Sequence, residues 1–142
     1  MRALLDVNVL IALHDRDHAL HERAAIWFDV NAPFGWASCP LTQIGCLRIM
    51  CQPGYGQAQP LAALIAMLRN SVTTEFHSFW GDDISILDQS RFRHGHMHSP
   101  RQLTDLYLLA LAVKNAGRFV TFDLRIPSTA VAGATDAHLV LL

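Results

Sequence analysis

The hydrophobic positions of the chain fall into short segments of two kinds, separated by polar breaks and by breaks that contain proline or glycine. Apolar runs of four or five residues, continuous or alternating, predict strands that are buried in a sheet. We expect strands at residues 3–7, 35–38, 83–87, 119–122 and 139–142. Apolar residues spaced three and four apart predict helices that bury one face. We expect helices at residues 9–13, 19–30, 40–50, 60–68 and 103–115.

The order of these segments predicts the fold class. Strands that alternate with helices along a chain are typical of a parallel sheet with helices packed on its faces. The chain contains no internal repeat, no low-complexity tract and no linker between domains. We therefore expect an α/β fold, a three-layer α/β/α sandwich around a mostly parallel sheet of about five strands. It should form one domain over residues 1–142.

Composition narrows the class of protein further. Hydrophobic residues make up 51% of the 142 positions and charged residues 16%, which excludes a disordered tail or a highly charged coil. No apolar run approaches the ~18 residues of a membrane span, and Asp6 interrupts the N-terminal segment too early for a signal peptide. The three cysteines, Cys39, Cys46 and Cys51, are expected to be reduced and buried, as in a cytoplasmic protein.

Three aspartates stand at positions that a parallel sheet brings to one edge. Asp6 follows the first expected strand, Asp123 follows the strand at 119–122, and Asp105 lies in the first turn of the last expected helix. Ligands of parallel α/β sheets bind beyond the carboxyl ends of the strands. Carboxylates this close together cannot all stay ionised without a cation, and Mg²⁺ or Mn²⁺ suits such a set of oxygen ligands.

Each aspartate taken alone has a simpler interpretation as a helix cap or a turn residue. The flanks of Asp6 and Asp123 are strongly apolar, however, and an isolated carboxylate beside a core is costly. The coincidence of all three at one edge therefore favours a shared metal site. A metal ion there can orient a water molecule, help to deprotonate it and stabilise charge on a phosphate during displacement.

Four segments, in chain order, resemble the motifs of the PIN domain family. Residues 4–10 resemble the opening motif, and residues 40–43 with Leu47 and Arg48 resemble the second motif of the toxin branch, the VapC-type ribonucleases. Residues 104–105 with 108–112 resemble the third motif. Residues 119–123 resemble the strand that carries the last acid. The resemblance implies a metal-dependent endoribonuclease that cuts RNA, the toxin of a type II toxin–antitoxin pair. It also implies Mg²⁺ or Mn²⁺ as cofactor, a cognate antitoxin that inhibits the enzyme, and a homodimer.

The resemblance assigns Asp6, Asp105 and Asp123 as the catalytic metal ligands. The second motif usually supplies a glutamate where this chain has Gln43. A neutral amide can still accept a hydrogen bond through its carbonyl or hold a water molecule, so Gln43 is expected to line the site. Its missing charge leaves open whether a second metal ion binds and whether activity is full.

Two further sets of side chains are expected to support the site. One set would orient the Asp6 carboxylate by hydrogen bonding: Asn8, with Thr104 or Thr121 as further candidates. The other set would hold the RNA backbone: Arg48 and, from the acid-free segment 89–104, Arg91, Arg93 and Arg101. Arginine suits phosphate because its planar guanidinium binds in a bidentate way. Arg48 could equally pair with the antitoxin or form a salt bridge.

The acid-free segment also contains His94, His96 and His98. Alternating histidines can chelate Zn²⁺, but no cysteine or acid lies nearby to complete a tetrahedral site. We interpret the segment as a solvated loop that contacts RNA phosphates, and a purely structural loop is the alternative.

Two other functions fit parts of the pattern. The segment 6–9 is similar to the nucleophile motif of the haloacid-dehalogenase phosphatases, but that family needs a second acid where this chain has Asn8. The lysine that those enzymes require could only be Lys114, at the far end of a helix. The second alternative is a catalytically silent PIN fold that binds RNA or protein, which Gln43 motivates.

Overall fold

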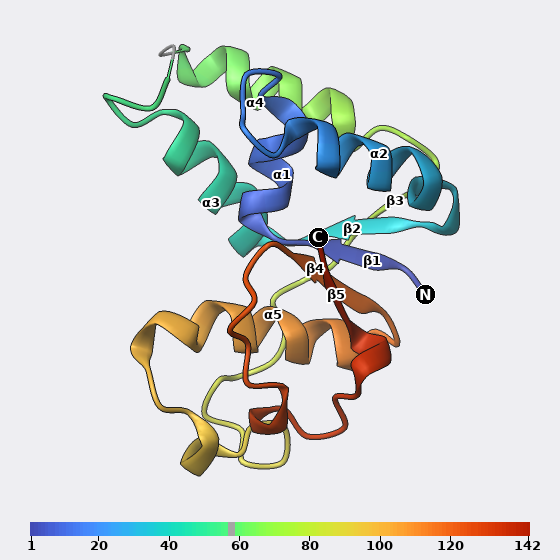
Figure 1. The fold of residues 1–142 in the computed structure, drawn as a ribbon, viewed down its shortest axis with the longest axis vertical. Coiled ribbons are helices and arrows are strands. Elements are labelled where there is room, and N and C mark those ends of the chain that lie inside the picture. Colours follow the sequence, from blue (N-terminus) through green and yellow to red (C-terminus); the bar gives the residue numbers. More distant parts are fainter. Residues whose placement is uncertain (57–58) are drawn as a thin grey trace.

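The computed structural model describes residues 1–56 and 59–142 and contains a sheet of five strands (Figure 1). The strands follow the order β3-β2-β1-β4-β5, so the first strand of the chain lies at the centre of the sheet. Their bounds are β1 Ala3–Leu5, β2 Trp36–Ser38, β3 His77–Phe79, β4 Arg118–Thr121 and β5 Leu139–Leu141. Every neighbouring pair is parallel, which confirms the expected α/β class.

Helices cover both faces of the sheet. Four of them pack on one face and the fifth packs on the other, so the expected three layers are confirmed (Figure 1). Their bounds are α1 Val7–His14, α2 His21–Asn31, α3 Pro40–Met50 and α4 Leu61–Ser71 on the first face, and α5 Leu103–Lys114 on the second. Within the described residues, none of these helices is both long and apolar enough to cross a membrane.

The central strands contribute side chains to two separate cores. Leu4 and Phe119 pack into the core beneath α5, whereas Leu5 and Val120 pack into the core beneath α1 and α3. All four side chains are fully buried. Because both faces of the sheet are covered, every position of β1 and the two central positions of β4, Phe119 and Val120, are apolar. This is why β1 could be predicted from a continuous apolar run and β4 from its apolar centre.

The prediction of the third strand was wrong. Residues 83–87 form a loop, and the edge strand of the sheet is β3 instead. The alternating pattern has another cause, because Ile84 and Ile86 pack from that loop against the core beneath α5. The polar composition of β3 hides it, and its Phe79 is 58% exposed, as suits a short edge strand with one neighbour.

The boundary between the first strand and the first helix also differs from the prediction. β1 ends at Leu5 and α1 begins at Val7, because Asp6 caps the helix. The Oδ1 atom of Asp6 accepts a hydrogen bond from the Val7 backbone nitrogen at 2.7 Å. The backbone nitrogen of Asp6 still donates to the Val120 carbonyl at 2.9 Å, as a strand residue would. The carboxylate therefore sits where strand turns into helix.

The packing of α1 against α3 depends on Gly45. A methyl group at this position would lie 2.6 Å from Cγ2 of Val7. We expect Gly45→Ala to lower the free energy of unfolding by about 1–3 kcal/mol, because the helices must separate or Val7 must leave its rotamer. Urea denaturation measures this loss. Gly81→Ala is the control, since nothing lies within 4 Å of its added methyl group, and equal losses in both variants would contradict the close contact.

Candidate functional site

A cavity of about 540 Å³ opens where α1, α3 and the start of α5 meet. Asp6, Asp105 and Asp123 all line it. They come from distant parts of the chain: the cap of α1, the first turn of α5 and the second residue after β4. The fold thus brings together the three acids that the sequence places at the carboxyl edge of the sheet.

Thr121 connects the two acids that follow β1 and β4. Its buried hydroxyl donates a hydrogen bond to Oδ2 of Asp6 at 2.6 Å. The same oxygen accepts a hydrogen bond from the backbone nitrogen of Asp123 at 3.0 Å, and Nδ2 of Asn8 approaches it at 3.4 Å. The pairing of β1 with β4 creates this arrangement, because it sets Asp6 beside the end of β4. Of the candidates for orienting Asp6, Thr121 is the one that contacts it directly.

The electrostatics of the cavity disfavour three free carboxylates. Burial is the main reason why the pKa of Asp6 is raised, although hydrogen bonds from Thr121 and Val7 oppose the shift. Burial, followed by the charges of Asp6 and Asp123, raises the pKa of Asp105 to about 7. A nearby cation would reverse these effects, because it favours the ionised form of each acid.

The chemistry of the donor set fits a hydrated hard cation. Asn8 Oδ1 is buried beside the acids and has no hydrogen-bond partner, although buried acceptors are nearly always satisfied. Among the described residues, no three His, Cys, Asp or Glu side chains lie close enough together to hold a metal ion by themselves. An ion in this cavity would therefore keep several water molecules, as Mg²⁺ usually does. Asn8 Oδ1 is placed to accept a hydrogen bond from such a water.

The other residues predicted for the site separate into two groups. Thr104 and Arg48 line the same cavity as the acids, and both are exposed at its mouth. Gln43 lines a different cleft, between α3 and α4. Its Nε2 atom donates to the hydroxyl of Ser38 at 3.0 Å, and Ser38 in turn bonds to His77. The structure therefore does not bring Gln43 into the cavity that the three acids line.

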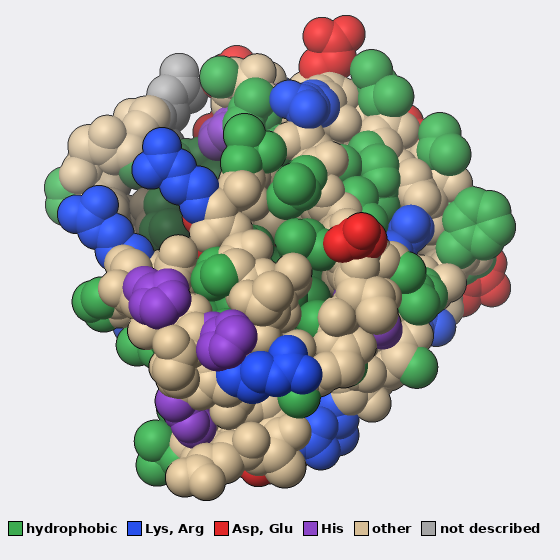
Figure 2. All heavy atoms as spheres, turned by 60° about the horizontal axis from the view of Figure 1, so that its bottom comes forward, with side chains coloured by type: hydrophobic (Ala, Val, Ile, Leu, Met, Phe, Trp, Pro, Cys, Tyr) green, Lys and Arg blue, Asp and Glu red, His purple; other side chains and the backbone are tan. Residues whose placement is uncertain are grey.

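The arginines of the acid-free segment lie outside the cavity. Arg91 pairs with Asp88 at 3.5 Å and Arg93 donates to the Thr129 carbonyl, whereas Arg101 lies in the turn before α5. On the face that carries α5 and its neighbouring loops, arginine and histidine side chains gather along one side, next to a hollow (Figure 2). The segment thus forms a largely exposed, cationic surface.

The three histidines of that segment do not form a cluster. His94 donates through Nε2 to the Ile86 carbonyl, whereas His96 faces the hydroxyl of Thr129 at 3.4 Å. His98 is exposed. Because the described contacts of His94 and His96 are to a backbone carbonyl and a hydroxyl, and not to a shared centre, the Zn²⁺ alternative has no support in the structure.

Two further sequence features also lie apart from the acids. Lys114 forms an ion pair with Asp83 at the opposite end of α5. Nine residues separate it from Asp105, about 14 Å along a helix, so the phosphatase alternative lacks its lysine. All three cysteines are free, and burial raises the pKa of Cys39 to about 11 and that of Cys46 to about 12. Cys51 is only half-buried, contrary to expectation.

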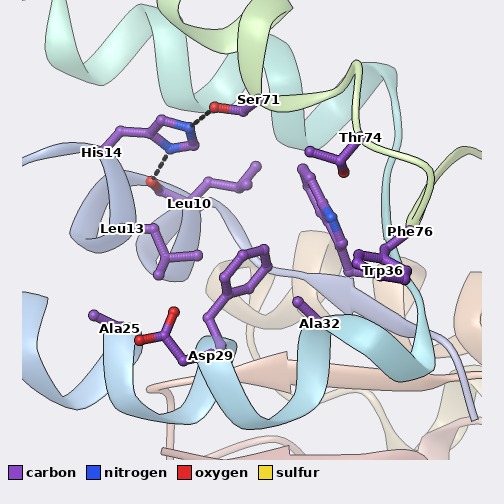
Figure 3. A pocket seen from close by; sticks show the side chains of 11 residues that line it. Leu10, Leu13, His14, Ala25, Asp29, Ala32, Trp36, Ser71, Thr74 and Phe76 are labelled. Carbon is purple, nitrogen blue, oxygen red and sulfur yellow. Dashed lines mark hydrogen bonds between the residues drawn. The ribbon is translucent and has the colours of Figure 1, made fainter.

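A second cavity, of about 370 Å³, lies between α1, α2 and the end of α4 (Figure 3). His14 joins two of these helices beside it: Nδ1 donates to the Leu10 carbonyl at 2.7 Å, and Nε2 lies 2.6 Å from the hydroxyl of Ser71. Burial lowers the pKa of His14. None of the three aspartates lines this cavity, so His14 acts as a link between helices and not as part of the acidic site.

The apolar border of the acidic cavity was not predicted. Leu41, Ile44 and Ile49 of α3 line it and are 40%, 55% and 36% exposed. The sequence of α3 did indicate an exposed apolar surface, because the helix carries apolar residues on more faces than one core can bury.

The comparisons with known proteins agree with this geometry. A family model described as PIN domain matches residues 3–132. Ribonuclease VapC44 of Mycobacterium tuberculosis (strain ATCC 25618 / H37Rv) is 52% identical over 142 residues, 100% of both chains, and Ribonuclease VapC39 of the same strain is 38% identical over 96% of this chain and 99% of its own. The crystal structure of VapBC2 from Rickettsia felis bound to a DNA fragment from their promoter contains a chain with the same fold, at a TM-score of 0.60 and 12% identity, covering 100% of this chain and 98% of that one. On these matches and on the arrangement of its acids, the chain belongs to the PIN domain family, in its VapC branch.

Proposed function

We propose that this protein is a metal-dependent endoribonuclease that hydrolyses RNA phosphodiester bonds and serves as the toxin of a type II toxin–antitoxin pair. Relatives named ribonucleases match it at 52% and 38% identity over nearly all of their length. The observation that carries the proposal is the convergence of Asp6, Asp105 and Asp123 on one cavity, where burial and mutual repulsion disfavour free carboxylates and a cation would stabilise them. The whole chain would act as one PIN-like domain.

The proposed mechanism assigns a task to each lining residue. Asp6, Asp105 and Asp123 would hold Mg²⁺ or Mn²⁺, which supplies charge stabilisation at the phosphate when bound. Thr121 fixes the Asp6 carboxylate through its 2.6 Å hydrogen bond. Asn8 Oδ1, the unpartnered buried acceptor, would orient the attacking water molecule. Arg48 at the mouth of the cavity would contact a phosphate of the RNA backbone.

The partners and the cellular location are part of the same proposal. A related chain occurs in the VapBC2 complex of Rickettsia felis, and we infer a cognate antitoxin for this protein also. We further propose a homodimer in the cytoplasm, where three free cysteines stay reduced. Arg91, Arg93 and Arg101 would contact RNA outside the cavity, from the exposed cationic surface.

Cleavage of an RNA stem-loop by the purified protein tests the proposal. We expect cleavage with Mg²⁺ or Mn²⁺, none with EDTA, and recovery when the ion is restored in excess. Binding of the RNA without cleavage under any of these ions would instead support the silent PIN fold. Cleavage that persists in EDTA would contradict the proposed role of the cavity.

The stability of the metal-free protein should depend on pH through Asp105. Its pKa in the folded state is about 7, against a usual value of 3.8. A raised folded-state pKa contributes stability below the usual value, and that stability is lost as the pH rises through the folded-state value. In EDTA, the urea midpoint of the wild type should therefore fall more steeply between about pH 4 and 7 than that of Asp105→Asn. Parallel curves for the two proteins would contradict this assignment.

A further inference from the structure

Gln43 lies outside the acidic cavity and belongs to a buried hydrogen-bonded network that the proposed mechanism does not use. Its Nε2 atom donates to the hydroxyl of Ser38 at 3.0 Å, and this hydroxyl lies 2.8 Å from Nε2 of His77. The imidazole ring makes a further hydrogen bond to the backbone of Val72, the C-cap of α4. The side chains of Gln43, Ser38 and His77, which we call the Ser38 network, therefore join α3, β2, β3 and the end of α4.

The Ser38 network can satisfy its hydrogen bonds without any charge. An amide nitrogen only donates, so Gln43 leaves the hydroxyl proton of Ser38 free for Nε2 of His77. The other ring nitrogen then carries the proton that reaches the Val72 carbonyl. Ser38 is fully buried, and burial together with the charge of Arg2 lowers the pKa of His77, which favours the neutral ring. The amide of Gln43 thus sets the direction of every hydrogen bond in the network.

Helix α3 turns opposite faces to the Ser38 network and to the acids. Gln43 and Leu47 line the cleft between α3 and α4, whereas Gly45 and Arg48 line the acidic cavity. Gln43 and Arg48 are about 140° apart around the helix and about 7.5 Å apart along its axis. A rotation of α3 that moved Gln43 off Ser38 would therefore turn Arg48 away from the mouth of the cavity.

We propose that Gln43 is a positioning residue, which fixes the rotation of α3 through the Ser38 network and so directs Arg48 at a phosphate of the RNA backbone. The inference rests on the proposed nuclease function, in which Arg48 contacts the RNA. Gln43 itself touches neither the metal ion nor the RNA. The first turn of α3 is held separately, because Oδ2 of Asp82 accepts a hydrogen bond from the Leu41 backbone nitrogen at 3.1 Å. The helix should therefore persist when Gln43 is replaced.

Gln43→Met tests the positioning role, because methionine has nearly the shape of glutamine but cannot donate a hydrogen bond. On a stem-loop RNA we expect KM to rise about three- to tenfold, equivalent to ~0.7–1.4 kcal/mol, the net contribution of one hydrogen bond. The value of kcat should stay within about twofold of the wild type, because the chemistry of the acids is untouched. Gln52→Met is the control and should leave KM unchanged, since Gln52 is exposed and lines neither the cleft nor the acidic cavity.

A double-mutant cycle shows whether Gln43 acts through Arg48. Arg48→Ala should itself weaken RNA binding, and adding Gln43→Met should weaken it no further, because the side chain that Gln43 positions is already absent. Fluorescence anisotropy in EDTA measures the dissociation constant of the RNA, so the result does not depend on cleavage. Additive losses in the double variant, or equal affinities of Gln43→Met and the wild type, would overturn the inference while leaving the nuclease function intact. Non-additive losses in a protein that cleaves RNA with no metal ion would support the positioning role and contradict the nuclease function.

Gln43→Glu tests the direction of the Ser38 network without RNA. An ionised carboxylate cannot donate, so the Ser38 proton should turn to it and Nε2 of His77 should take up a proton. The negative charge then raises the pKa of His77 above that in the wild type. Among the described residues, the charged groups that face the network are Arg2, whose charge acts on His77, and Arg69, which lines the cleft.

Nitrogen chemical shifts of the His77 ring, measured by NMR, report which of its nitrogens carry protons. We expect a protonated Nδ1 and a bare Nε2 in the wild type, and protons on both nitrogens in Gln43→Glu at the same pH. A protonated Nε2 in the wild type, or an unchanged ring in Gln43→Glu, would overturn the network on which the inference depends.

Calorimetric titration with Mn²⁺ shows which way residue 43 faces. Because Gln43 lies outside the acidic cavity, Gln43→Glu should bind Mn²⁺ as tightly as the wild type. Binding that is tighter by about tenfold or more would place the new carboxylate beside the acids, where it would act as a further ligand. That result would overturn the inference.

Discussion

Replacing Asp105 by asparagine is expected to lower kcat for RNA cleavage by a factor on the order of 10³. A divalent ion contributes several kcal/mol to stabilising charge at a phosphate, and each 1.36 kcal/mol corresponds to a factor of about ten. Asparagine keeps the shape of the side chain but removes one of the three negative charges that face the cavity. Initial rates with saturating RNA and Mn²⁺ measure the effect.

A stability measurement separates loss of chemistry from loss of fold. Asp105→Asn removes a carboxylate whose pKa is raised by burial and then by the charges of Asp6 and Asp123, so the metal-free variant should be at least as stable as the wild type at about pH 8. Asp136→Asn, an exposed acid outside the cavity, is the control and should keep full activity. Cleavage by Asp105→Asn within a factor of about three of the wild type would remove Asp105 from the proposed mechanism.

Thr121→Val should weaken Mn²⁺ binding about 10–100-fold, the usual cost of removing a residue that orients a metal ligand. Valine has nearly the same shape as threonine but cannot donate the 2.6 Å hydrogen bond to Asp6 or accept one from the Asp123 backbone nitrogen. Calorimetric titration with Mn²⁺ measures the affinity. The free energy of unfolding should fall by about 1–3 kcal/mol, because the buried Asp6 carboxylate loses its hydroxyl donor.

Thr121→Ser provides the rescue for this experiment. Serine retains the hydroxyl, so it should recover most of the Mn²⁺ affinity while leaving a small cavity where the methyl group was. Equal loss of affinity in the serine and valine variants would show that packing at Thr121, and not its hydrogen bonds, supports the acids.

The central part of the fold could be predicted from local pattern, because its residues are buried on both faces. β1 and the centre of β4 have apolar side chains that fill two cores, so these positions form short continuous apolar segments in the sequence. β3 could not be predicted, because two of its three residues, His77 and Ser78, are polar and form no apolar run, unlike the other edge strand, β5. Ile84 and Ile86 gave the alternating pattern typical of a strand because both side chains pack from a loop against the core beneath α5.

At the candidate site, the sequence alone predicts which acids come together but not which neighbouring side chains contact them. Sequence position places Asp6, Asp105 and Asp123 at one edge, since the carboxyl ends of parallel strands lie together at one edge of the sheet. It cannot choose between Thr104 and Thr121, because only the pairing of β1 with β4 sets Thr121 against Asp6. The cleft that the Gln43 side chain lines is formed by the packing of α4 against α3. This packing cannot be predicted from the local sequence around Gln43.

The most direct test of the metal site is a crystal structure of the protein soaked in Mn²⁺, with anomalous data collected near the manganese absorption edge. We expect an anomalous peak inside the cavity, with carboxylate oxygens of Asp6, Asp105 and Asp123 facing it and water completing the coordination. A crystal that shows no peak there at millimolar Mn²⁺, or a peak held by other residues, would contradict a metal site formed by these three acids.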